Sequence, residues 1–213
     1  MNNLAHPASN FTRIREGVDV TGLLKEIEAA PEMWLSDTSR QRKVRCQRHT
    51  RNIFLRVARK PLPADAKNAN DVHESVYARN ARRFPNALKF LHTTAVSERA
   101  TLGRATLVSL PAGKCVYPHR DAGDYYRVRD RYHLVLRSPQ GSLLRAGDQT
   151  VVMREGELWV FNNKIEHAAQ NPALSTRIHL IFDLLPVPGH GHYVNRQQRD
   201  RAENGTSLSI FDA

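Results

Sequence analysis

The feature of this sequence that most limits its fold is a series of short apolar segments after residue 103, each ended by turn residues. About eight of them follow one another, at 105–110, 115–118, 132–136, 142–145, 150–153, 158–161, 165–169 and 177–184. Glycine, proline and aspartate mark the breaks, as in Pro139-Gln140-Gly141 and Ala146-Gly147-Asp148. Short, evenly spaced strands of this kind predict a mainly β architecture, either a sandwich or a jelly-roll barrel.

The first hundred residues predict a helix-containing support for these strands. Apolar residues recur at helical spacing from Val20 to Ile27, and Asp19 or Thr21 is placed to cap the start of that helix. A second helix is expected to begin close to Pro85, because proline is tolerated in a first turn and not in a helix interior. Shorter features are expected as a strand near 11–14, a strand at 50–58 and a surface loop at 64–74.

The length of 213 residues suits one sizeable domain. We expect residues 1–213 to form a single domain in three parts. These are an N-terminal support region at 1–100, a β core at 101–186 and a C-terminal tail at 187–213.

The composition narrows the partners and the location. The net charge of +11 favours an anionic partner, and it is densest between residues 40 and 51, in Arg40, Arg42, Lys43, Arg45, Arg48 and Arg51. A solvated basic face explains that run equally well, and nucleic acid is not favoured because no groove-reading motif accompanies the charge. No apolar run reaches the roughly 20 residues that span a bilayer, and the N-terminus lacks a signal-peptide core. With only two cysteines, we expect a cytoplasmic protein with no membrane segment.

A candidate metal site lies among the strands. His119 and Asp121 are two residues apart, so in an extended chain their side chains leave the same face. His167 supplies a second imidazole, and two imidazoles with one carboxylate are the ligands of a non-haem Fe(II) oxygenase. Arg177 lies inside an apolar strand, where a guanidinium is costly to bury without an anion, and a dicarboxylate would supply that anion. The residues therefore predict iron bound beside a carboxylate co-substrate.

Residues 103–185 resemble the aspartyl/asparaginyl β-hydroxylase family of Fe(II)- and 2-oxoglutarate-dependent dioxygenases. The motifs that carry the resemblance are Tyr117-Pro118-His119-Arg120-Asp121, Asp130-Arg131-Tyr132-His133-Leu134, Gly156-Glu157-Leu158-Trp159-Val160-Phe161-Asn162-Asn163, Glu166-His167 and Arg177-Ile178-His179-Leu180. The stretch 48–56 also resembles the region ahead of the barrel in small bacterial members. The resemblance implies a double-stranded β-helix, the jelly-roll or cupin-like barrel, with flanking N-terminal helices.

The resemblance also implies roles for single residues. His119 and His167 match the two iron-ligating imidazoles, and Asp121 would complete the facial triad that some members lack. Arg177 matches the arginine that binds the distal carboxylate of 2-oxoglutarate, and Arg131 with His133 matches the pair that reaches its other end. The implied cofactors are Fe(II), 2-oxoglutarate and O2. The implied reaction hydroxylates an aspartyl, asparaginyl or other amino-acid residue, free or in a peptide or protein, acidic substrates included, with release of succinate and CO2.

Several alternatives stay open. Asp121 could be an outer salt-bridge partner, and His133 and His179 could be hydrogen-bonded residues of the barrel interior. His190 and His192 form another two-apart pair, but no carboxylate accompanies them in their glycine- and proline-rich loop. The alternative function is a non-catalytic cupin-like module that binds a metal or a carboxylate, because the same ligands also hold Zn, Ni or Mn.

Overall fold

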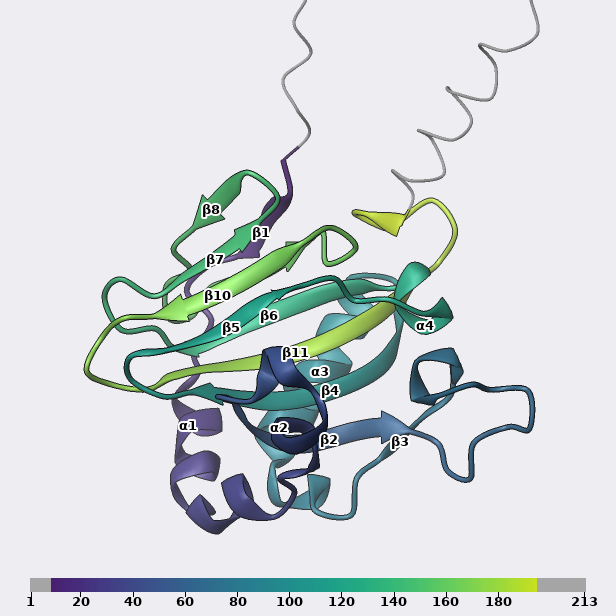
Figure 1. Ribbon diagram of the computed structural model, residues 1–213, viewed down its shortest axis with the longest axis horizontal. Helices are drawn as coiled ribbons and strands as arrows, with labels where there is room; N and C mark the ends of the chain where they lie inside the picture. Colours follow the sequence, from purple (N-terminus) through teal and green to yellow (C-terminus); the bar gives the residue numbers. More distant parts are fainter. Residues whose placement is uncertain (1–8, 195–213) are drawn as a thin grey trace, which may run out of the picture.

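The computed structural model describes residues 9–194 and has two antiparallel β-sheets facing each other (Figure 1). The larger sheet has seven strands in the order β1-β9-β6-β11-β4-β2-β3, and the smaller has four in the order β5-β10-β7-β8. The strands are β1 Phe11–Arg15, β2 Arg51–Ala58, β3 Ser75–Tyr77, β4 Ala100–Leu110, β5 Lys114–His119, β6 Asp130–Arg137, β7 Leu143–Ala146, β8 Gln149–Val151, β9 Leu158–Phe161, β10 His167–Asn171 and β11 Arg177–Pro186.

The eight strands from β4 to β11 form a double-stranded β-helix. Strands β4, β6, β9 and β11 lie in the larger sheet, and β5, β7, β8 and β10 lie in the smaller one, so the chain crosses repeatedly between the two. This arrangement confirms the predicted fold class. Three strands from the N-terminal region extend the larger sheet at its two edges, and one of them, β3, was not predicted.

Helices cover the outer face of the larger sheet. The predicted helices are present as α1 (Thr21–Glu28) and α3 (Pro85–Ser97), and Asp19 Oδ1 accepts a hydrogen bond from the Thr21 backbone N–H at 2.9 Å. Their apolar sides pack on the outward residues of the strands, which include Leu107, Leu134 and Leu180. The shorter helices are η1 Pro31–Leu35, α2 Ser39–Lys43, η2 Arg45–Gln47, η3 Ala69–Asp71, η4 Ala81–Arg83 and α4 Asp124–Arg127. No helix among residues 9–194 is long and apolar enough to cross a membrane.

A second, smaller apolar cluster fills part of the space between the sheets. It consists of Phe11, Leu110, Val135, Leu144, Ala146, Met153, Phe161 and Ala169. Because side chains alternate along a strand, the inward positions of β6 and β11 that this cluster leaves free carry polar residues instead. Arg131, His133, Arg177, His179 and Asp183 are all buried there. The fold thus brings five polar side chains into the barrel.

The chain after β11 turns back onto β6. The Asp130 carboxylate accepts hydrogen bonds from the backbone N–H groups of His192, Tyr193 and Val194 at 2.7, 3.0 and 3.3 Å. Tyr193 is buried. The first part of the predicted tail is therefore packed against the barrel, and the rest of it, 195–213, lies outside the described residues.

Candidate active site

Two neighbouring strands of the smaller sheet bring the predicted triad together. His119 ends β5 and His167 begins β10, and the two residues are directly paired in the antiparallel register, with ring centroids 4.2 Å apart. Asp121 follows β5. Its Oδ1 lies 4.0 Å from His119 Nε2, and its Oδ2 lies 3.8 Å from His167 Nε2. One ligand atom from each of the three residues lies within 4.8 Å of the others, a spacing that suits a metal ion.

Both histidines are held in the tautomer that a metal needs. His119 Nδ1 lies 2.8 Å from the Tyr117 carbonyl oxygen, and His167 Nδ1 lies 3.0 Å from the Ile165 carbonyl oxygen. A carbonyl can only accept, so each Nδ1 donates and each Nε2 keeps its lone pair for a metal. Burial, partly offset by Asp121, lowers the pKa of His167 to about 4, so this ring is neutral at pH 7.

The Asp121 side chain is 8% exposed, and its carboxylate is ionised. Its Oδ2 accepts hydrogen bonds from Arg131 Nη1 at 2.5 Å and from Asn163 Nδ2 at 3.0 Å. Burial alone would raise the pKa of Asp121, but the nearby Arg131 charge and the Asn163 hydrogen bond bring that pKa down to about 2. The Oδ2 atom therefore has protein partners, while Oδ1 faces His119, where it can bind a metal.

Arg131 lies between two carboxylates. Besides Asp121, it binds Asp183 through two parallel hydrogen bonds, Nε to Oδ1 at 2.8 Å and Nη2 to Oδ2 at 3.1 Å. The β6–β11 register places Asp183 directly opposite Arg131. Sequence reasoning missed Asp183 and Asn163, although an aspartate inside the apolar strand 177–184 was a visible signal for the first.

Arg177 is buried without a counter-charge. Its Nε donates to His179 Nε2 at 3.0 Å, and its Nη2 lies 3.2 Å from His179 Nδ1, but within residues 9–194 it makes no ion pair. Burial lowers the pKa of Arg177 to about 10, so the guanidinium stays protonated at neutral pH. An uncompensated buried charge is unfavourable, and a bound anion would relieve it.

A line of rings joins this guanidinium to the triad. His179 Nδ1 lies 3.2 Å from His133 Nδ1, and Phe161 stands between His133 and His167 with centroid distances of 5.1 Å to each. Burial holds the pKa of both His133 and His179 well below the usual histidine value, so both rings are neutral. The site thus offers metal ligands on the smaller sheet and an anion anchor on the larger one.

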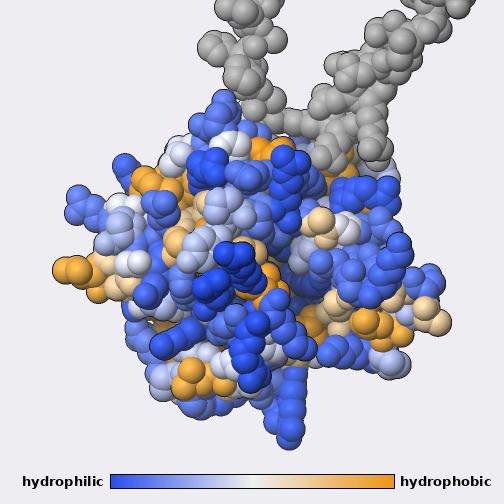
Figure 2. Space-filling model, viewed as in Figure 1, coloured by the Kyte–Doolittle hydropathy of each residue, from blue (hydrophilic) through white to orange (hydrophobic). Residues whose placement is uncertain are grey.

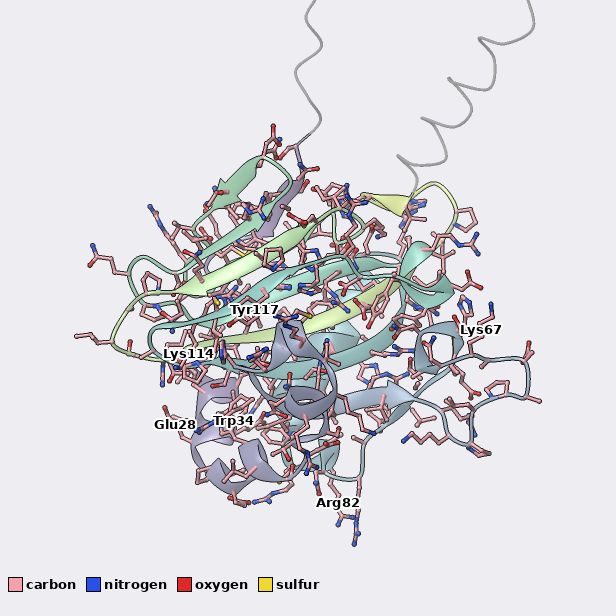
Figure 3. The ribbon with its side chains drawn as sticks, viewed as in Figure 1. Glu28, Trp34, Lys67, Arg82, Lys114 and Tyr117 are labelled. Atoms are coloured by element: carbon pink, nitrogen blue, oxygen red, sulfur yellow. The ribbon has the colours of Figure 1, made fainter. Side chains whose placement is uncertain are left out.

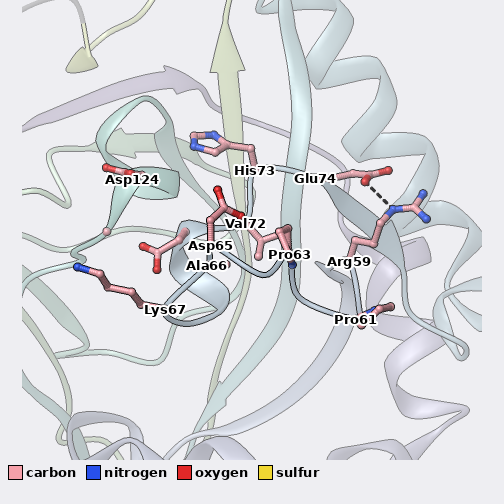
Figure 4. A pocket seen from close by; sticks show the side chains of 12 residues that line it. Arg59, Pro61, Pro63, Asp65, Ala66, Lys67, Val72, His73, Glu74 and Asp124 are labelled. Carbon is pink, nitrogen blue, oxygen red and sulfur yellow. Dashed lines mark ion pairs between the residues drawn. The ribbon is translucent and has the colours of Figure 1, made fainter.

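Other candidates lie away from the triad. His192 Nε2 pairs with Glu98 Oε2 at 3.2 Å and is not among the clustered metal ligands. A surface cavity of about 560 Å³ lies between the loop at 59–74 and α4 (Figure 4). It is lined by groups of both charges, including an Arg59–Glu74 ion pair of 2.6 Å, and by none of the predicted site residues.

Comparisons with known proteins agree with the motif analysis. The sequence profile of the family described as "Aspartyl/Asparaginyl beta-hydroxylase" matches residues 66–186. No curated protein matches the chain.

Among solved structures, a conserved protein of unknown function from Streptococcus pyogenes is 22% identical, with 40% of this chain and 66% of that chain covered and a TM-score of 0.31. An oxidoreductase of the 2OG-Fe(II) oxygenase family from Burkholderia pseudomallei is 12% identical, with 67% and 71% covered and a TM-score of 0.47. The viral collagen prolyl hydroxylase of Paramecium bursaria Chlorella virus-1 is 11% identical, with 84% and 97% covered and a TM-score of 0.49.

Proposed function

Because the chain belongs to the aspartyl/asparaginyl β-hydroxylase family, we propose that it is an Fe(II)- and 2-oxoglutarate-dependent hydroxylase whose iron is held by His119, Asp121 and His167. The matched range contains the whole triad and the two buried arginines of the site, Arg131 and Arg177. The prediction that the chain is a dioxygenase of the hydroxylase type is confirmed by this match.

The observation that carries the metal assignment is the donor set itself. Two imidazoles with free Nε2 lone pairs and one ionised carboxylate converge within 4.8 Å inside the barrel. Two histidines and one carboxylate bind iron on one face and leave the opposite positions open. When bound, Fe(II) would supply the activation of O2 for attack on an unactivated C–H bond. Arg131 and Asn163 would hold Asp121 in the orientation that this ligand set needs.

The co-substrate assignment depends on Arg177. A guanidinium can bind a carboxylate through two charge-assisted hydrogen bonds, and Arg177 has no carboxylate partner within residues 9–194. We assign it to the distal carboxylate of 2-oxoglutarate, with His179 fixing its orientation. Arg131 uses three of its five N–H donors on Asp121 and Asp183, so two remain for the other end of the co-substrate, beside His133.

The overall reaction balances without a further reactant. A substrate C–H group, O2 and 2-oxoglutarate give a C–OH group, succinate and CO2. The chain's own part is to orient the target carbon and to exclude water, and the apolar cluster around Phe161 closes the barrel beside the site. The substrate carbon belongs to an amino-acid residue, free or within a peptide or protein.

The test is an anaerobic titration of the metal-free protein with Fe(II) and 2-oxoglutarate, followed by the visible charge-transfer band of the chelated oxoacid. We expect a band in the wild type, no band in His119→Ala and a weaker band in Arg177→Ala. Arg82→Gln, at an exposed residue of η4, is the matched control and should behave as the wild type. Metal binding without any band would instead favour the metal- or carboxylate-binding module.

A further inference from the structure

The basic segment, residues 40–51, lies against the strand that carries His119. Its η2 helix contacts β5, His49 Nδ1 lies 3.2 Å from the Cys115 carbonyl oxygen, and the Arg48 guanidinium lies 5.5 Å from the centre of the Tyr117 ring. Figure 1 shows α2 standing in front of the strands, and Figure 3 shows Tyr117 beside the same segment. This segment precedes the family match and packs on β5 beside the triad, and we call residues 40–51 the wall of the site.

One side chain of this wall reaches the triad itself. Gln47 Nε2 lies 3.5 Å from His119 Nε2, the nitrogen assigned to the metal. The buried Thr50 hydroxyl donates to the Gln47 backbone carbonyl oxygen at 2.9 Å and lies 3.5 Å from the side-chain oxygen, Oε1. Asn52 Nδ2 in turn donates to Thr50 Oγ1 at 3.1 Å. A metal that takes the His119 lone pair would free the Gln47 amide N–H for another acceptor beside the triad.

The wall carries uncommitted positive charge. None of its six cations makes an ion pair within the part of the chain that the structure describes. Arg40 is half-buried. Burial raises the pKa of the Cys46 thiol, the Arg40 charge lowers that pKa and the Asp121 charge raises it, so Arg40 and the triad carboxylate both act on the same thiol. Figure 2 shows strongly hydrophilic surface over α2 and its surroundings. An anion at this wall would meet several cations that no carboxylate holds in an ion pair within residues 9–194.

We propose that the basic segment selects an acidic peptide as substrate, an inference that rests on the proposed function. Arg40 and Arg48 bind the carboxylates of the peptide, and Gln47 donates a hydrogen bond beside the reacting carbon. The co-substrate does not need these cations, because the buried Arg177 is available for its distal carboxylate. A nucleic acid would need a row of aromatic platforms or a groove-reading element. The exposed aromatic ring beside the wall is Tyr117 of β5, and the Arg48 guanidinium already lies over it.

The test uses three short peptides that share a central aspartate and differ only in glutamate, glutamine or lysine flanks. With the iron- and 2-oxoglutarate-loaded enzyme, the glutamate peptide should give the fastest succinate release and should gain one oxygen atom by mass. Arg40→Gln should raise the KM for that peptide about tenfold, the loss of one charge-assisted interaction, without changing the affinity for 2-oxoglutarate. Arg40→Lys should recover part of the loss, because it restores the charge but not the fork.

Arg82→Gln is the control for a general loss of positive charge. Figure 3 shows Arg82 at the lower edge of the molecule, away from Tyr117. Equal rates for the glutamate and glutamine peptides, an unchanged KM in Arg40→Gln, or equally strong competition by a single-stranded oligonucleotide would each overturn the inference. A missing charge-transfer band in the wild type would instead count against the proposed function. Fluorescence anisotropy of the labelled glutamate peptide, which needs no turnover, would then still decide whether the wall binds it.

Discussion

Replacing Arg177 with methionine should make the ligand-free protein more stable and at the same time remove its affinity for 2-oxoglutarate. Burial alone lowers the pKa of Arg177 from the usual arginine range to about 10. At about 1.4 kcal/mol for each tenfold change in acidity, that fall corresponds to about 3 kcal/mol of unfavourable desolvation. The lost hydrogen bond to His179 takes back about 1 kcal/mol, which leaves a net gain of about 2 kcal/mol in the free energy of unfolding.

The loss of binding should be larger than the gain in stability. Two charge-assisted hydrogen bonds to a carboxylate contribute about 3 kcal/mol or more, so the Kd for 2-oxoglutarate should rise at least about a hundredfold. Urea unfolding of the metal-free protein measures the first effect, and calorimetric titration in the presence of Fe(II) measures the second. Adding 2-oxoglutarate should stabilise the wild type and leave the variant unchanged.

Arg131→Met is the matched control, because Arg131 is equally buried but pairs with Asp121 and Asp183. It should destabilise the protein by about 3–5 kcal/mol, since two buried carboxylates lose their partner. The reasoning would be refuted if Arg177→Met were as destabilising as this control. That result would mean that Arg177 has a counter-charge inside the protein and that no bound anion is needed to explain it.

Three further predictions concern the same network. Asp183→Asn should lower the free energy of unfolding by about 3 kcal/mol in a urea titration, because Arg131 then keeps only the Asp121 carboxylate. A loss below about 1 kcal/mol would contradict the ion pair between Arg131 and Asp183. The metal-free protein should lose stability as the pH falls from about 4 towards 2, because the pKa of Asp121 is about 2 in the folded state and about 3.9 in the unfolded state. In urea titrations, Asp121→Asn should make this fall of the free energy of unfolding with pH less steep. His179→Leu should raise the Kd for 2-oxoglutarate about tenfold in a calorimetric titration by freeing Arg177, and a fall in Fe(II) affinity instead would assign His179 to the metal site.

Sequence reasoning reached the barrel because its strands are local signals. Alternation and turn residues mark segments such as Leu158–Phe161 without any knowledge of their neighbours. The two-apart spacing of His119 and Asp121 is equally local, but the pairing of His119 with His167 is a property of strand register, which spacing along the chain cannot give. A family resemblance supplied that step.

The residues that were missed depend on contacts between distant segments. Gln47 comes within 3.5 Å of His119 only because η2 packs on β5, and a glutamine in a polar stretch carries no signal of its own. The short strand β3 is held to β2 by pairing between Tyr77 and Arg56, and its three residues are too few for a periodic pattern. The predicted single domain and the catalytic roles stay predictions.

The hydrogen bonds between Asp130 and the chain after β11 determine how far a truncated version of this protein can be shortened at its C-terminal side. Asp130 and Arg131 are neighbours on β6, so one side chain fastens the returning chain while the next one holds Asp121. The family match ends at residue 186, but the three backbone donors to Asp130 come from residues 192–194. A clone cut at the edge of the match would take all three backbone donors away from the Asp130 carboxylate, which is 1% exposed in the intact structure and also pairs with Lys164. The shortest sound expression boundary therefore lies after Val194.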